Sequence, residues 1–224
     1  MRTLAAITLS LFALPALAER SCVGDAMIVF DGSGSMAEVG FNQINEARIF
    51  DARRAMARVI PEISESRRLG LVVYGPGGSD ECTGVDLRFP PMDDAAGPIL
   101  EAVDTLEPLG NTPLTKAVMR AADVLKQDGG GEIVLVTDGK ETCGGLPCRL
   151  ATELSDQNVT VHVIGFRVRG THFAWQSQGQ TDYNDAETVS RCLAEQTDGQ
   201  YVRAETLDDL IGALRITLGC NVLM

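Results

Sequence analysis

Residues 26–35 read AMIVFDGSGS, so an apolar run is followed at once by an aspartate, two serines and two glycines. A short apolar run without polar alternation predicts a strand covered on both faces, as in parallel sheets. The polar residues after it would lie at the carboxyl end of that strand, where open α/β sheets bind their ligands. The segment therefore predicts an α/β fold with a polar site at the end of its first strand.

Apolar runs rich in β-branched residues predict further strands at 69–74, 133–136 and 159–166, and residues 200–204 are expected to form the last strand. Helical patterns lie between the runs, at 44–63, 95–106, 114–126, 150–157 and 207–218. This alternation predicts a doubly wound, mostly parallel sheet with helices on both faces. Residues 85–89 follow a turn-rich segment and are expected to add one antiparallel edge strand, which makes the sheet six-stranded.

The first 18 residues have the features of a secretory leader. Arg2 precedes the apolar run 4–14, and Ala16-Leu17-Ala18 provides a small-residue cleavage site. The run is shorter than the ~20 residues that a helix needs to cross a bilayer. We expect residues 1–18 to be a cleaved signal peptide and residues 19–224 to be one exported domain. That domain is expected to be periplasmic or secreted, without a membrane span after cleavage, and monomeric on its own.

The expected mature chain is strongly acidic. Loss of Arg2 with the leader leaves 18 basic and 31 acidic side chains, a net charge of −13. Nucleic-acid binding depends on clustered lysine and arginine, so a nucleic-acid partner is not expected.

All six cysteines follow the expected cleavage site: Cys22, Cys82, Cys143, Cys148, Cys192 and Cys220. An even number in an exported chain predicts disulfides. Cys22 precedes the first strand and Cys220 ends the last helix, so these two are expected to pair. For the others, the fold favours 82 with 143 and 148 with 192, and a local 143–148 bond is the alternative. A thiolate zinc site is a further alternative, although no CxxC spacing is present.

Three polar segments follow the predicted strands or precede a helix: residues 31–35, DGSGS; residues 110–113, GNTP; and residues 137–139, TDG. Taken separately, each has an ordinary structural explanation as a helix cap or a turn. Taken together, their order and strand context resemble the metal-ion-dependent adhesion site (MIDAS) of the von Willebrand factor type A (VWA) domain family. The resemblance covers nearly all of residues 19–224.

The resemblance implies a divalent-metal site formed by Asp31, Ser33, Ser35, Thr112 and Asp138. It implies that both serines bind the ion directly, and that the other three residues bind it directly or through water. Hydroxyl and carboxylate oxygens are hard donors that suit Mg²⁺, or Mn²⁺ or Ca²⁺. The resemblance further implies a binding function without catalysis, in which a partner protein's acidic residue completes the metal shell.

Two enzymatic alternatives compete with this interpretation. A metal-dependent hydrolase could use Asp31 and Asp138 to position an ion that activates water. The motif offers no general base, however, and His162 lies in an apolar run where a core histidine is expected. Residues 32–37 also fit the dinucleotide fingerprint GxGxxG/A. Asp31 would then place a carboxylate beside the pyrophosphate, which disfavours this alternative. A purely structural role would need a vestigial site, yet no motif position is substituted.

The longest irregular segment is 167–185, which leaves the same edge of the sheet as the motif. Loops of this length are unusual in a compact domain unless they are functional or disordered. Its arginines and aromatic residues are typical of interface anchors, and the candidates for partner contact are Arg167, Arg169, Phe173, Trp175 and Tyr183. Two interpretations stay open: the loop selects the partner, or Phe173 and Trp175 pack it onto its own domain.

Overall fold

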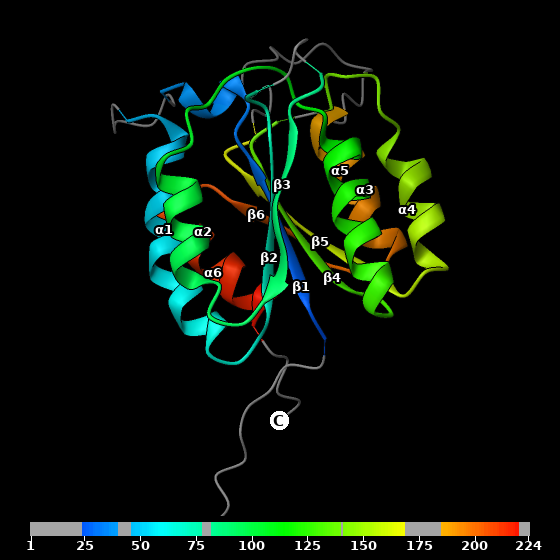
Figure 1. Ribbon diagram of the computed structural model, residues 1–224. Coiled ribbons are helices and arrows are strands. Elements are labelled where there is room, and N and C mark those ends of the chain that lie inside the picture. The colour runs from blue at the N-terminus through cyan, green and yellow to red at the C-terminus, as the bar shows by residue number, and fades with distance from the viewer. Residues whose placement is uncertain (1–23, 40–45, 78–81, 140, 169–184, 220–224) are drawn as a thin grey trace, which may run out of the picture.

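The computed structural model describes residues 24–39, 46–77, 82–139, 141–168 and 185–219, and Figure 1 shows their arrangement. The sheet has the order β3-β2-β1-β4-β5-β6. Its strands are β1 (Ala26–Asp31), β2 (Leu69–Tyr74), β3 (Val85–Met92), β4 (Gly131–Thr137), β5 (Val159–Phe166) and β6 (Tyr201–Ala204). Every neighbouring pair is parallel except β2 and β3, which are antiparallel. The predicted doubly wound, mostly parallel sheet with one antiparallel edge strand is confirmed.

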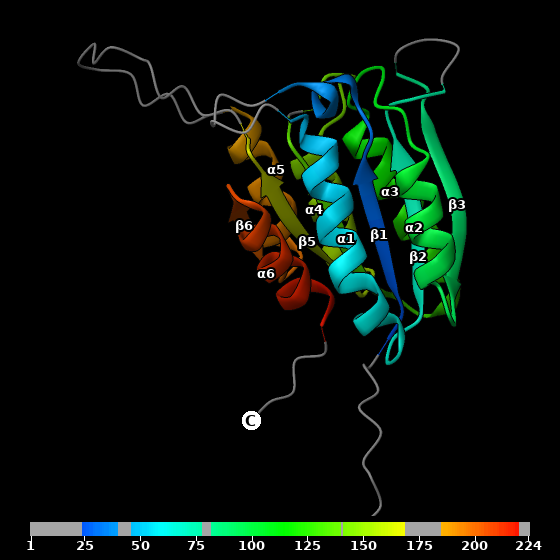
Figure 2. The ribbon, with the colours of Figure 1, turned by 90° about the vertical axis from the view of Figure 1, so that its left-hand side faces the viewer.

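Helices cover both faces of the sheet, as Figures 1 and 2 show. One face carries α1 (Arg48–Ser64), α2 (Ala96–Asp104) and α6 (Leu207–Leu218). The other face carries α3 (Leu114–Leu125), α4 (Pro147–Ser155) and α5 (Asp185–Gln196). Two short 3₁₀ turns, η1 (Gly34–Ala37) and η2 (Lys126–Asp128), follow β1 and α3 respectively.

The core consists of two apolar layers separated by the sheet. Along β1, Ile28 and Phe30 pack into the layer with α1, α2 and α6, whereas Met27 and Val29 pack into the layer with α3 and α4. Burying each such side chain stabilises the fold by about 1.5–3 kcal/mol. Because β1 is buried on both faces along its whole length, its last residue enters the carboxyl edge of the sheet from a rigid strand.

The edge strand β3 is longer than the sequence pattern indicates. It continues through Pro90 and Pro91 to Met92, three residues beyond the expected end. Proline cannot donate to a strand partner, so sequence patterns end strands there, but an edge strand needs hydrogen bonds on one side only. Gly70 on β2 provides the room, because a Cβ there would come within 2.8 Å of the Pro91 nitrogen.

Two disulfides lie within the described part of the chain. Cys82 pairs with Cys143, and Cys148 pairs with Cys192, as in the favoured scheme rather than in the local alternative. The first bond ties the β2–β3 connection to the segment after β4, and the second joins α4 to α5. The expected bond between Cys22 and Cys220 lies outside the described residues, as does the expected leader 1–18.

Among the described residues, no helix is both long and apolar enough to cross a membrane.

Candidate metal centre

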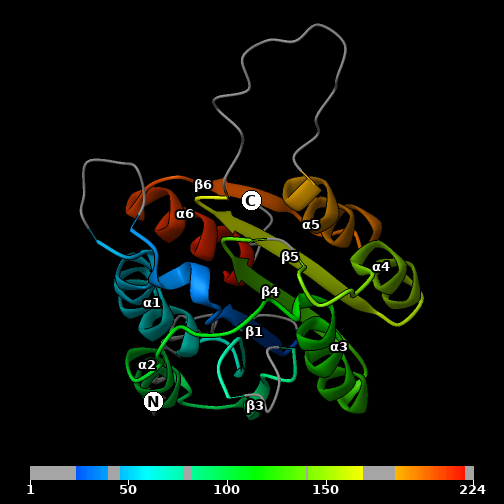
Figure 3. The ribbon, with the colours of Figure 1, turned by 90° about the horizontal axis from the view of Figure 1, so that it is seen from above.

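The three predicted polar segments meet at the carboxyl edge of the sheet, which Figure 3 views from above. Strands β1 and β4 are parallel neighbours, with Phe30 opposite Val136. The residues that follow these two positions, Asp31 and Thr137-Asp138, therefore emerge side by side. All five predicted metal ligands lie at this edge, and four of them have 5% or less of their surface exposed: Asp31, Ser33, Thr112 and Asp138.

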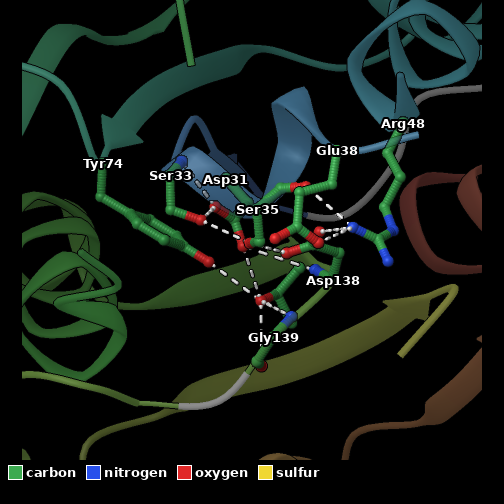
Figure 4. A network of polar contacts seen from close by, with 9 residues as sticks. Asp31, Ser33, Ser35, Glu38, Arg48, Tyr74, Asp138 and Gly139 are labelled. Atoms are coloured by element: carbon green, nitrogen blue, oxygen red, sulfur yellow. Dashed lines mark hydrogen bonds and ion pairs between the residues drawn. The ribbon is translucent and has the colours of Figure 1, made fainter. Parts of the chain in front are cut away.

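Asp31 is the hub of the polar network drawn in Figure 4. Its Oδ1 accepts hydrogen bonds from the Ser33 amide at 2.8 Å and from the Ser33 hydroxyl at 2.6 Å. Its Oδ2 accepts from the Thr137 hydroxyl at 2.8 Å. Both carboxylate oxygens are thus used within the network, and the single hydrogen of Ser33 is committed to Asp31. The lone pairs of Ser33 Oγ remain available to a cation.

Ser35 repeats this arrangement with the second aspartate. Its hydroxyl donates to Asp138 Oδ1 at 2.6 Å, and its Oγ lies 3.1 Å from Ser33 Oγ. Since each hydroxyl already donates its hydrogen to a carboxylate, this contact brings two oxygen lone pairs together. Neighbouring ligands in an octahedral shell with bonds of about 2.1 Å lie about 3.0 Å apart. The two serine oxygens are therefore spaced as adjacent ligands of one small divalent ion.

Thr112 reaches the same place from a different loop. The Gly34 amide donates to the Gly110 carbonyl at 3.0 Å, which fastens the threonine loop to the serine loop. A Cβ placed on Gly139 would lie 3.8 Å from Ser35 Oγ and 4.0 Å from Thr112 Oγ1. The two hydroxyls therefore converge beside Gly139, whose lack of a side chain leaves that space open.

The surroundings of Asp138 in the site raise its pKa. Burial first, and then the charge of Asp31, raises the pKa of Asp138 to about 7, although hydrogen bonding from Ser35 and the nearby Arg48 charge oppose this. Its Oδ2 is buried and has no hydrogen-bond partner. Arg48 Nη1 lies 3.1 Å from it, but not in hydrogen-bonding geometry. A buried carboxylate oxygen that lacks a donor, next to two serine oxygens, is suited to a cation.

The donor set is made of hydroxyls and only two carboxylates. No cluster of three or more His, Cys, Asp or Glu side chains that could hold a metal occurs in the described part of the chain. Hydroxyl and carboxylate oxygens bind hard ions such as Mg²⁺, whereas thiolates favour zinc. The residues present therefore fit the divalent ion that the motif implies.

Arg48 is a site residue that the sequence motif does not reveal. It is the first residue of α1 and is only 3% exposed. Its Nη1 donates to the Ser35 carbonyl at 2.8 Å and lies 3.4 Å from Glu38 Oε2. The sequence carries no signal for this role, because the helix was predicted to begin at residue 44, whereas α1 begins at Arg48.

Thr137 and Tyr74 form a second layer behind Asp31 that sequence reasoning also missed. The Tyr74 hydroxyl donates to Thr137 Oγ1 at 3.0 Å, and Thr137 in turn donates to Asp31. Burial raises the pKa of Tyr74 well above its ordinary value, so this hydroxyl stays protonated and remains a donor. The chain of hydrogen bonds orients Asp31, as outer-layer partners do around metal ligands.

Arg167 differs from the expectation that it contacts a partner. It is 8% exposed, its Nη2 lies 2.6 Å from Asp51 Oδ2, and its Nε donates to the Glu205 carbonyl at 3.0 Å. A guanidinium held this way joins α1 to the end of β5, within the domain itself. The other four candidates for partner contact, Arg169, Phe173, Trp175 and Tyr183, lie outside the described residues.

His162 is a satisfied core histidine. Its Nδ1 accepts a hydrogen bond from the Gln200 amide at 3.1 Å, and its Nε2 lies 3.8 Å from a Glu132 carboxylate oxygen. Burial lowers the pKa of His162, which favours the neutral ring. Glu132 is near the amino end of β4, whereas the aspartates follow the carboxyl ends of the strands. His162 is therefore not placed to act as a base at the candidate metal site.

A doubly wound sheet with hydroxyls and carboxylates gathered at its carboxyl edge defines a class of α/β domains built to hold a ligand at the strand ends. The chain belongs to the von Willebrand factor type A domain family, whose profile matches residues 26–141.

The chain is similar to YwmC of Bacillus subtilis (strain 168), with 31% identity over 160 residues, which cover 66% of this chain and 68% of that protein. Its fold is similar to that of an aerotolerance-related membrane protein from Bacteroides fragilis, with a TM-score of 0.61 and 18% identity over 88% of this chain and 98% of that one. It is also similar to proximal thread matrix protein 1 from the mussel byssus with a zinc-occupied MIDAS motif. That likeness has a TM-score of 0.58 and 18% identity, and covers 90% of this chain and 49% of that one.

Proposed function

We propose that this protein is an exported protein-binding module that holds Mg²⁺, or a similar divalent ion, and captures a partner through an acidic side chain. One observation carries the proposal. The Ser33 and Ser35 oxygens lie 3.1 Å apart, with their hydrogens donated to Asp31 and Asp138. When bound there with Thr112 as a further ligand, the ion would supply an electrophilic position for a carboxylate oxygen.

The comparisons and the cysteines support this proposal. VWA domains generally mediate protein interactions, and the mussel protein holds zinc at its MIDAS motif. In this chain the donors are hydroxyls and carboxylates, which favour Mg²⁺, Mn²⁺ or Ca²⁺ over zinc. Disulfides persist in oxidising compartments, so the two bonds in the structure support a location in the periplasm or outside the cell.

The experiment that tests the function is affinity capture from the native exported fraction with the mature protein as bait. We expect a protein to be retained with millimolar Mg²⁺ and released by chelator. Thr112→Ala should lose capture, whereas Thr105→Ala, a matched change at the exposed end of α2, should keep it. If the captured protein stayed bound in the presence of chelator, metal-dependent binding would be contradicted. Turnover of phosphate or peptide esters by the purified protein would instead favour the hydrolase.

The affinity for Mg²⁺ should fall as the pH drops below about 7. The raised pKa of Asp138 means that the metal-free protein binds a proton there near neutral pH. Protonated Asp138 stabilises the metal-free fold fully below about pH 4, and this contribution is lost as the pH rises through 7. Metal must displace that proton, so we expect about tenfold weaker binding for each pH unit below 7. Calorimetric titrations from pH 5.5 to 8 check this, and a constant affinity across that range would contradict it.

A further inference from the structure

Arg48 lies where two carboxylates and the serine loop meet, and the family motif gives it no role. Figure 4 shows its guanidinium facing both Asp138 and Glu38. The same nitrogen, Nη1, is 3.1 Å from Asp138 Oδ2, 3.4 Å from Glu38 Oε2 and 2.8 Å from the Ser35 carbonyl oxygen. We propose that Arg48 is a positioning residue that holds these two carboxylates, and so keeps the bound ion electrophilic and open to a partner's carboxylate. This inference rests on the proposed function.

Burying the Arg48 guanidinium would be energetically unfavourable if its role were only structural. The side chain is 4% exposed, its Nε has no hydrogen-bond partner, and it begins α1 at the positive end of the helix dipole. Buried ion pairs often contribute no more to stability than apolar residues of similar size. A cation in this position therefore points to a requirement of the site rather than of the fold.

Three of the four carboxylate oxygens of Asp31 and Asp138 already accept hydrogen bonds from hydroxyl groups. Both oxygens of Asp31 already accept hydrogen bonds from Ser33 or Thr137. Asp138 Oδ1 accepts from Ser35. Asp138 Oδ2 accepts no hydrogen bond, and the charge of the nearby Glu38 carboxylate acts on Asp138. Both face Arg48 Nη1.

The charge of the surroundings decides how a bound divalent ion behaves. If Asp138 Oδ2 and Glu38 were released from Arg48, their negative charge would neutralise more of the ion's charge. The ion would then be held more tightly but would attract another carboxylate less. With Arg48 in place, metal affinity is lower and the attraction for an incoming carboxylate is higher. Arg48 and Glu38 should therefore affect the two affinities in opposite directions.

The test measures both affinities on the mature protein with defined probes. Mn²⁺ binding is followed by calorimetry, and acetate binding to the Mn²⁺-loaded protein is followed by the loss of water-proton relaxation enhancement as acetate displaces bound water. We expect Arg48→Gln to bind Mn²⁺ about tenfold more tightly and acetate about tenfold more weakly. Glu38→Gln should do the reverse, with Mn²⁺ about threefold weaker and acetate about threefold tighter.

Arg54→Gln is the matched control. Arg54 lies on the same helix and pairs with Glu46 and Asp51, without contacting the candidate metal site. It should leave both affinities within about twofold of the original protein. Because Glu38 is half exposed, Glu38→Gln tests the inference even if Arg48→Gln fails to fold.

The outcomes separate this inference from the proposed function. If the unmodified protein binds no Mn²⁺ in the millimolar range, the proposed function falls. If it binds Mn²⁺ but the loaded site takes no acetate, or if Glu38→Gln moves both affinities in the same direction or neither, the role assigned to Arg48 and Glu38 is overturned.

Discussion

Replacing Asp31 by alanine should weaken Mg²⁺ binding by about 100-fold, the upper range for removing a residue that orients metal ligands. Asp31 accepts the hydrogen of the Ser33 hydroxyl, and its other oxygen is tied to Thr137. Without it, Ser33 is free to turn its hydrogen toward the ion. Calorimetry measures the affinity. Thermal unfolding measures the stabilisation by Mg²⁺ at about 100 times the original dissociation constant, which should fall from roughly 2.7 kcal/mol in the original protein to about 0.4 kcal/mol in the variant.

Asp86→Ala is the control for the loss of one negative charge. Asp86 lies on β3 with its side chain 55% exposed and pairs only weakly, at the surface, with Arg88. We expect Mg²⁺ affinity and the stabilisation by Mg²⁺ to stay within about twofold of the original values. If Asp31→Ala behaved like Asp86→Ala, the metal would have to bind elsewhere, and the interpretation of this edge as a metal centre would be wrong.

Gly75→Ala should disrupt the metal centre although Gly75 belongs to no motif. Gly75 follows β2 with φ +114°, and a Cβ there would lie 2.4 Å from the Gly32 carbonyl carbon and 2.5 Å from the Ser33 nitrogen. The backbone strain and the collision together should lower the free energy of unfolding by about 3–4 kcal/mol. Relief of the collision moves the turn that carries Ser33, so Mg²⁺ binding should be lost as well. Denaturant unfolding and calorimetry measure the two effects.

Gly77→Ala isolates the strain from the collision. Gly77 has a similar φ of +92°, but a Cβ there would meet no atom within 4 Å. Gly77→Ala should lower the free energy of unfolding by only about 1 kcal/mol and leave the Mg²⁺ affinity unchanged. If Gly75→Ala and Gly77→Ala lost stability and Mg²⁺ affinity to the same extent, a methyl group at residue 75 would not displace the turn that carries Ser33.

The sequence was most informative where elements are long and periodic. The strand at 159–166 and the helix at 207–218 have the predicted bounds, because each is marked by an uninterrupted pattern and ends at polar or turn residues. Boundaries were less accurate where a local rule was overridden. β3 crosses two prolines, and α4 begins at Pro147 rather than at residue 150, since proline is favoured in the first turn of a helix.

The motif residues could be read from the sequence because their spacing along the chain is their signature. Oxygen-bearing side chains at alternate positions after one strand, with a threonine and an aspartate at two other loops, occur in that order whatever surrounds them. Parallel strand order then brings their loops to one edge, and the structure places Asp31, Ser33, Ser35, Thr112 and Asp138 there. These residues and the sheet that carries them were accessible from the chain alone.

The surroundings of that motif emerged only in three dimensions. Arg48 and Asp138 are 90 residues apart in sequence, and Arg167 and Asp51 are 116 apart, so no local pattern relates them. Whether an arginine is a surface anchor or a buried counter-ion depends on which charge the folded chain places beside it. That is why the ion pair of Arg167 with Asp51 was not foreseen and Arg48 was overlooked. Residue types and spacing specify the ligands, whereas the packing of distant segments sets the charge, burial and hydrogen bonding that govern what those ligands can hold.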